Sequence, residues 1–170
     1  MKIIGFDPGA TTGFAVYDST ERRLIACGHF PRHQFSTDAW DHVLWSADGK
    51  TPVVFESLEQ PRGNIFPAVV LAAIDEGRMR EQVLASTGIE PHCISRHEVK
   101  QVLSAAVHNE PYCKTDKDVW AALVVLHGEG SDQKRTKSHE AGCIGLATSH
   151  ERAALAVAVA WAIRQGLWKP

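Results

Sequence analysis

Met1-Lys-Ile-Ile-Gly-Phe-Asp-Pro-Gly-Ala-Thr-Thr-Gly-Phe-Ala-Val-Tyr17 is the stretch that decides the fold. An apolar run ends at a single carboxylate, Asp7, and Pro8-Gly9 then turns the chain, which resumes with apolar residues from Gly13. Strand, turn residues and strand in that order predict a β-hairpin. Asp7 lies late on a strand with buried neighbours, where a carboxylate is costly unless it is paired or binds a metal. The structural alternative is that Asp7 only caps the Pro-Gly turn.

The rest of the chain alternates between strand and helix patterns. Residues 23–30 predict a third antiparallel strand, and residues 51–58 predict a short strand, covered on both faces, with a second lone carboxylate, Glu56, near its end. Residues 91–95 show the last strand pattern. Helices are predicted at 34–49, 67–86, 98–106, 116–127 and 149–165, and a polar, basic loop at 128–142. This order indicates an α/β fold.

Composition excludes several classes of protein. The 170 residues fit one domain over 1–170, and a net charge of −2 excludes a protein that is basic all over, so nucleic-acid binding requires a local patch. We expect a cytoplasmic protein, because no run is long and apolar enough to span a membrane and no signal or transit peptide is evident. The cysteines are expected to be reduced thiols, since no Cys-x-x-Cys pair occurs among Cys27, Cys93, Cys113 and Cys143. A zinc site is an alternative, with a spacing that matches no usual pattern, from Cys113, His139, Cys143 and His150.

Two strand-end carboxylates, Asp7 and Glu56, are expected to face the same point, because their strands can lie side by side. Two such carboxylates repel each other unless a cation joins them, and hard oxygen ligands favour Mg²⁺ or Mn²⁺. The final helix supplies the third contribution, since positions 150 and 153 share the helix face that turns toward the sheet. His150 also has a bland interpretation as a surface residue near a helix start.

Five motifs span almost the whole chain. They are Ile4-Gly-Phe-Asp-Pro-Gly9 with Thr12-Gly13, Val53-Val-Phe-Glu56, Glu98-Val-Lys-Gln-Val102, Thr115-Asp-Lys-Asp-Val119 and His150-Glu-Arg-Ala-Ala-Leu-Ala-Val-Ala158. In this order they resemble the RuvC family of Holliday junction resolvases, in the RNase H-like superfamily. The resemblance implies an RNase H-like fold, with a mixed five-stranded sheet flanked by helices.

The resemblance also implies the active site. Asp7, Glu56 and two residues of the last helix would bind two Mg²⁺ or Mn²⁺ ions, with His150 as a ligand or a proton handler. Lys117 would lie near the scissile phosphate as a catalytic residue, and Lys100 would contact the DNA backbone. Further DNA contacts are expected from basic residues of the loops, namely Arg62, Lys114, Lys134, Arg135 and Lys137.

The chain departs from the family pattern in its last helix. The family has Asp three residues after the first helix ligand, whereas this chain has Ala153. Three explanations are open: the alanine is an engineered substitution, Glu151 or Glu140 supplies the missing carboxylate, or the protein binds junctions without cutting them. For Glu151 we favour a capping role, because Thr148-Ser-His-Glu151 spells a capping box.

A second departure follows Glu56. Bacterial members of the family carry an aromatic residue there that wedges into the junction centre, whereas this chain reads Ser57-Leu-Glu-Gln-Pro-Arg62. The wedge is therefore Leu58, the later Phe66, or absent. Junction sequence preference does not carry over.

These observations together predict a structure-selective endonuclease for four-way or branched DNA, which leaves 5′-phosphate and 3′-hydroxyl ends, in a bacterial or phage-infected cell. A near two-fold junction favours a homodimer. The helix at 67–86 is the expected interface, because its apolar side carries more than one sheet needs to cover; the candidate apolar residues are Val70, Leu71, Ile74, Met79, Val83 and Leu84. The alternative is a catalytically silent protein that binds branched DNA. An ATPase of the actin or sugar-kinase type shares the hairpin but holds nucleotide between two domains. This chain has length for only one domain, so no nucleotide cofactor is expected.

Overall fold

The predicted hairpin forms the middle of a five-stranded sheet in the computed structural model, which describes residues 1–31, 43, 50–57, 67–108, 113–127 and 149–168. The strands are β1 (Lys2–Asp7), β2 (Thr11–Asp18), β3 (Arg23–Pro31), β4 (Val53–Ser57) and β5 (His92–Ser95). Their order is β3-β2-β1-β4-β5, antiparallel among β1, β2 and β3, and parallel from β1 to β4 and β5. The predicted mixed five-stranded sheet is confirmed.

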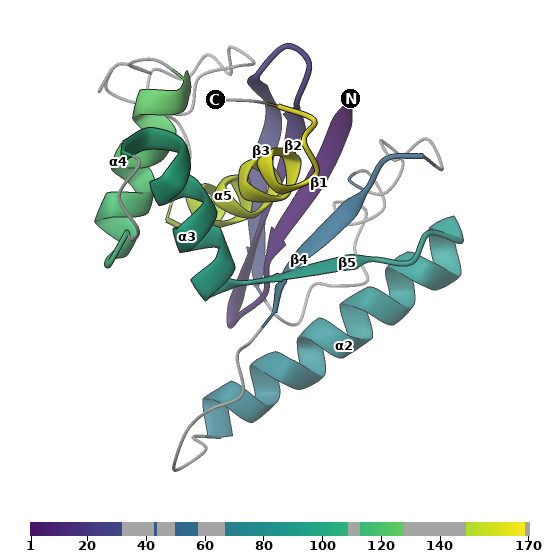
Figure 1. The fold of residues 1–170 in the computed structure, drawn as a ribbon. Coiled ribbons are helices and arrows are strands. Elements are labelled where there is room, and N and C mark those ends of the chain that lie inside the picture. The colour runs from purple at the N-terminus through teal and green to yellow at the C-terminus, as the bar shows by residue number, and fades with distance from the viewer. Residues whose placement is uncertain (32–42, 44–49, 58–66, 109–112, 128–148, 169–170) are drawn as a thin grey trace, which may run out of the picture.

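Helices cover both faces of this sheet. The described helices are α2 (Pro67–Thr87), α3 (Arg96–His108), α4 (Asp116–His127) and α5 (Ser149–Arg164). Helix α5 crosses one face with α3 and α4 beside it, and α2 lies against the other face (Figure 1). The helix predicted at 34–49, apart from Val43, and the loop predicted at 128–142 lie outside the described residues.

Strand alternation sorts the side chains between these two layers. Ile3 and Val54 belong to the core beneath α3, α4 and α5, whereas Ile4 and Phe55 pack with Met79 on the α2 side. Every second residue of a strand faces the same way. The side chain of Asp7 therefore faces α5, as that of Ile3 does, and the side chain of Glu56 faces α5, as that of Val54 does. Both acidic residues therefore face the same layer.

Helix α5 is the central element of that layer, since every residue from Ala154 to Ala162 is buried. Each large side chain of this segment contributes about 1.5–3 kcal/mol through burial. Two glycines permit a close approach: a Cβ at Gly5 would overlap the carbonyl oxygen of Ala154, and one at Gly13 that of His150. The first turn of α5 therefore lies directly on β1 and β2, which sets His150 beside the end of β1.

Helix α3 begins two residues earlier than the predicted start at residue 98. The backbone N–H of Glu98 donates to Ser95 Oγ at 3.2 Å, and the backbone N–H of Ser95 donates to Glu98 Oε2 at 2.9 Å. This reciprocal pair is a capping box, which satisfies two N–H groups that the helix itself leaves free. It makes Arg96 the first residue of α3.

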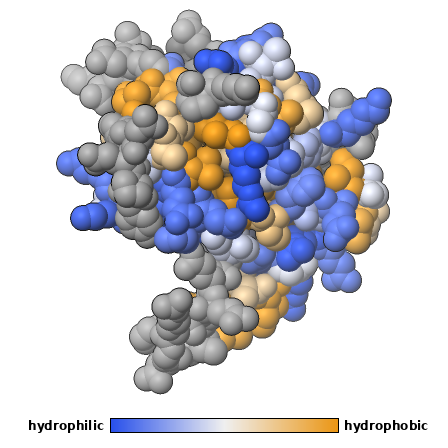
Figure 2. Space-filling view, in the orientation of Figure 1, coloured by the Kyte–Doolittle hydropathy of each residue, from blue (hydrophilic) through white to orange (hydrophobic). Residues whose placement is uncertain are grey.

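The predicted apolar face of α2 is only partly buried. Met79 and Val83 pack under the sheet as expected, together with Ala72. The other predicted members are exposed by 43–47%, namely Val70, Leu71, Ile74 and Leu84. Hydrophobic surface is accordingly visible along α2 in Figure 2. As expected, the apolar face is wider than the sheet covers, because β4 and β5 are short and cover only a narrow stripe of a helix of 21 residues.

Candidate active site

Asp7 and Glu56 end two adjacent parallel strands. Phe6 lies opposite Phe55 in the β1–β4 register, so Asp7 and Glu56 are the next residues along each strand. Neighbouring strands are about 4.8 Å apart, and both side chains face α5. The structure therefore brings together the two carboxylates singled out in the sequence, within the reach of one shared cation.

His150 adds the contribution of the last helix. Its Nδ1 lies 3.5 Å from Asp7 Oδ2, while the imidazole is 45% exposed and the Asp7 side chain 18%. Burial raises the pKa of Asp7 from 3.8 to about 6, the Arg96 charge lowers it, and Asp116 raises it further. A half-exposed imidazole beside a carboxyl whose pKa is raised is a pair suited to proton transfer.

Glu56 is held by a residue that the sequence analysis missed. Arg96 Nη1 donates to both Glu56 oxygens at 2.9 Å each. Burial nevertheless raises the pKa of Glu56 from 4.5 to about 7, with the Arg96 charge opposing the rise and Asp7 adding to it. The desolvation of this carboxylate is thus stronger than the attraction of its arginine.

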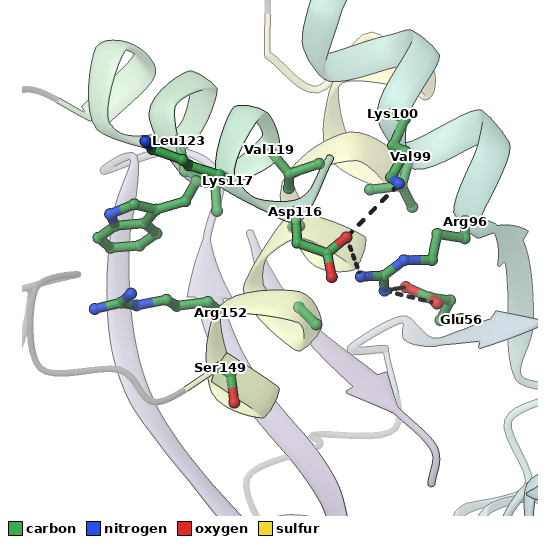
Figure 3. A pocket seen from close by; sticks show the side chains of 13 residues that line it. Glu56, Arg96, Val99, Lys100, Asp116, Lys117, Val119, Leu123, Ser149 and Arg152 are labelled. Atoms are coloured by element: carbon green, nitrogen blue, oxygen red, sulfur yellow. Dashed lines mark hydrogen bonds and ion pairs between the residues drawn. The ribbon is translucent and has the colours of Figure 1, made fainter. Parts of the chain in front are cut away.

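The arginine also joins Glu56 to the start of α4. Its Nη2 lies 2.6 Å from Asp116 Oδ1, which in turn lies 3.6 Å from Lys100 Nζ (Figure 3). Lys100 is only 16% exposed and also donates to the backbone carbonyl of Lys114 at 3.1 Å. Lys100, predicted to contact DNA, is therefore already engaged by Asp116.

Local capping signals in the sequence place Arg96 and Asp116 at helix starts, although they do not show that the two residues pair. Ser95-Arg-His-Glu98 has the capping-box pattern, and Thr115-Asp-Lys-Asp118 has the same form with Asp in the last place. In the structure, Asp118 Oδ2 accepts from the backbone N–H of Thr115 at 2.7 Å, as the third helix residue of a capping box does. The residues that follow the two caps are Arg96 and Asp116. Each is the first residue of its helix, and both helices begin beside the site.

A cavity of about 310 Å³ extends from Glu56 to the space between α4 and α5. Its polar lining includes Arg96, Lys100, Lys117 and Arg152, and its apolar lining includes Val119, Trp120 and Leu123. Ala153 also lines it. A carboxylate at position 153 would therefore enter the cavity that Glu56 borders.

The acidic alternatives at the last helix are placed differently. Glu151 is buried and faces β3, where its Oε1 lies 2.8 Å from His29 Nδ1 and its Oε2 accepts from Cys27 Sγ at 3.8 Å. The capping role favoured for Glu151 depends on Thr148, and the alternative acid is Glu140; both lie outside the described residues.

Most of the predicted DNA contacts and two residues of the alternative zinc site also fall outside the described residues. These are Arg62, Lys134, Arg135 and Lys137, the wedge candidates Leu58 and Phe66, and the zinc candidates His139 and Cys143. Of the remaining predicted contacts, Lys114 and Lys117 are both exposed.

Comparison with known proteins gives a structural match without a sequence match. No family model matches the chain, and no curated protein matches it either. A Thermus thermophilus RuvC structure aligns over 100% of this chain and 99% of its own, with a TM-score of 0.63 at 20% identity. The chain has the RuvC fold. T. thermophilus RuvC in complex with a Holliday junction substrate aligns over the same shares, with a TM-score of 0.63 at 18% identity.

The two strand-end carboxylates offer the oxygen ligands that a hard divalent ion prefers. Mg²⁺ is commonly held by one or two carboxylates, with substrate phosphate and water completing its shell. Asp7 and Glu56 fit that pattern, because they end adjacent strands on the same face of the sheet and are both mostly buried. Within the described residues, no group of three or more His, Cys, Asp or Glu is placed to hold a metal ion. The two carboxylates therefore fit one divalent ion, while the expectation of two ions stays a prediction.

No helix among the described parts of this RuvC-fold chain is both long and apolar enough to cross a membrane.

Proposed function

We propose that this protein is a divalent-metal-dependent endonuclease that acts on branched DNA, with the four-way junction as its preferred substrate. The observation that carries the proposal is the meeting of Asp7 and Glu56 on one face of the sheet, beside a cavity lined by basic residues. The T. thermophilus RuvC structure with a Holliday junction suggests which DNA to test first.

Each residue has a part in this proposal. Asp7 and Glu56 would hold divalent metal, which when bound would supply activation of water for in-line attack and stabilisation of the leaving 3′ oxygen. His150, 3.5 Å from Asp7, holds or passes a proton at Nδ1. Lys117 is exposed at the first turn of α4 and binds the phosphate. The ends produced are a 5′ phosphate and a 3′ hydroxyl.

DNA binding depends on local charge, because the chain as a whole carries −2. The cavity gathers Arg96, Lys100, Lys117 and Arg152. Affinity for DNA should therefore fall steeply with salt, as counterions released from the phosphates make binding sensitive to salt. A homodimer, with the exposed apolar residues of α2 in its interface, would offer two sites to the two opposed strands of a junction.

A second candidate is a protein that binds branched DNA without cutting it. Two observations favour it: Ala153 stands where the resemblance expects Asp, and Arg96 neutralises Glu56 with two hydrogen bonds. An arginine paired in this way competes with any other cation for the same carboxylate.

One experiment separates the two candidates. Four-way, Y-shaped and linear DNA of the same sequence are incubated with the protein in Mg²⁺ or Mn²⁺, and binding and cleavage are measured side by side. The chain as given, Ala153→Asp and Asp7→Asn are compared. Cleavage by the chain as given, abolished in Asp7→Asn, supports the nuclease. If only Ala153→Asp cuts, or none cuts while all bind junctions, the binding protein is the correct description. Equal affinity for the three DNA forms would refute both.

A further inference from the structure

The cavity contains a stacked pair that neither the metal site nor the motifs explain. Arg152, on the first turn of α5, places its Cζ 4.0 Å from the centroid of the Trp120 ring on α4. Arginine stacks well on indole, and the contact orients the flat guanidinium. Figure 3 shows Arg152 extending to the side of the cavity away from Glu56.

Arg152 differs from the other arginine of the cavity in its partners. Arg96 is fully engaged by Glu56 and Asp116, and Lys100 by Asp116. Within the described part of the chain, by contrast, Arg152 has no ion pair, and its Nε is buried without a hydrogen-bond partner. Lys117, which also lines the cavity, is likewise without an ion pair among the described residues. Among the described residues, these two cations of the cavity have no carboxylate partner and can bind an anion from outside.

The lining next to these cations is apolar. Val119, Leu123 and Trp120 border the same cavity of about 310 Å³. This volume is at the small end of ligand pockets, which span about 300–1,000 Å³. An apolar lining beside two cations suits a single nucleotide, since a base stacks on aromatic rings and guanidinium planes while its phosphate pairs with Arg and Lys.

We propose that Arg152, Trp120 and Lys117 form a subsite for one unpaired nucleotide of the branched DNA. The base lies against the stacked Arg152–Trp120 pair, and the phosphate is bound by Arg152 and Lys117. Because the cavity is continuous with Glu56, this nucleotide neighbours the phosphate that faces Asp7 and Glu56. The subsite rests on the proposed function in that it requires DNA binding, but it does not require cleavage.

The test uses a fluorescein-labelled four-way junction, with affinity measured by anisotropy in EDTA at several salt concentrations. Arg152→Gln is compared with Arg164→Gln, which removes the same charge from the same helix at its pair with Glu98. We expect Arg152→Gln to bind the junction about five- to tenfold more weakly. The slope of log affinity against log salt concentration, here the salt slope, should be smaller in magnitude by about one. Arg164→Gln should retain the wild-type affinity. Equal affinities and slopes in the two variants would overturn the subsite.

Two further variants separate stacking from charge and guard against a folding defect. Arg152→Lys keeps the charge but loses the planar group, so it should weaken binding while leaving the salt slope unchanged. Trp120→Phe keeps a ring and should bind more tightly than Trp120→Leu. Full affinity in both Arg152→Lys and Trp120→Leu refutes the proposal. If the wild-type chain itself shows no preference for the junction over linear DNA, the proposed function fails instead, and the two failures are thus distinguishable.

Discussion

Replacing Glu56 by Gln should stabilise the protein at high pH. Burial raises the pKa of Glu56 from 4.5 to about 7 in the folded chain. Between those two pH values the folded state binds more protons than the unfolded state, so stability falls as pH rises through that window. A pKa difference of this size lowers the free energy of unfolding by about 3 kcal/mol above pH 7. Gln resembles the neutral acid and avoids this cost, so Glu56→Gln should be about 1–3 kcal/mol more stable than wild type at pH 8.

The assay is urea unfolding followed by circular dichroism at pH 5 and pH 8, in EDTA so that no divalent ion neutralises the site. At pH 5 the gain should shrink to about 1 kcal/mol or less, since the carboxyl is then largely protonated in the folded chain. Glu98→Gln is the control, because the hydrogen bond from the Ser95 backbone lowers the pKa of Glu98, and its loss should therefore destabilise the protein at pH 8. A Glu56→Gln variant less stable than wild type at pH 8, or with the same gain at both pH values, would refute the reasoning.

Three further predictions concern single residues. Arg96→Gln should bind Mn²⁺ at least about tenfold more tightly than wild type in calorimetry, because it removes a positive charge from Glu56; unchanged affinity would contradict the role of Arg96 as a competitor. Gly13→Ala should cost about 1–3 kcal/mol in urea unfolding, because its Cβ would overlap the His150 carbonyl, whereas Gly77→Ala, in open space on α2, should cost nothing. Leu71→Glu should shift a dimer toward monomer in sedimentation equilibrium, because Leu71 is 47% exposed on α2. Ala85, also exposed on α2, provides the control variant Ala85→Glu. A monomeric wild type would exclude the dimer.

The arrangement of Asp7 and Glu56 was predictable because it depends on local patterns and strand order. Each carboxylate follows an apolar run that reads as a strand, and adjacent strands of one sheet bring their ends together. The boundaries of α4 and α5 were predictable for a similar reason, since apolar spacing and polar starts are local signals. The surplus of apolar residues on α2 was predictable too, but which of them stay exposed was not, because that depends on how much sheet lies above the helix.

The pairing of Arg96 with Glu56 and Asp116 could not be read from the sequence. These three residues come from β4, α3 and α4, and 40 residues separate the arginine from Glu56. No periodicity records such a contact, because it arises only when two capped helix starts are packed against the same strand end. The same holds for Arg152 on Trp120, which joins α5 to α4.

The sequence by itself determined the strands, the helices and the acidic residues at the strand ends, since hydrophobic spacing and turn residues act over a few neighbours. The tertiary structure alone decided which cations neutralise those acids and which stay available for a ligand. The physical reason is that ion pairing and desolvation depend on distances through space, and those distances exist only once the helices have packed onto the sheet.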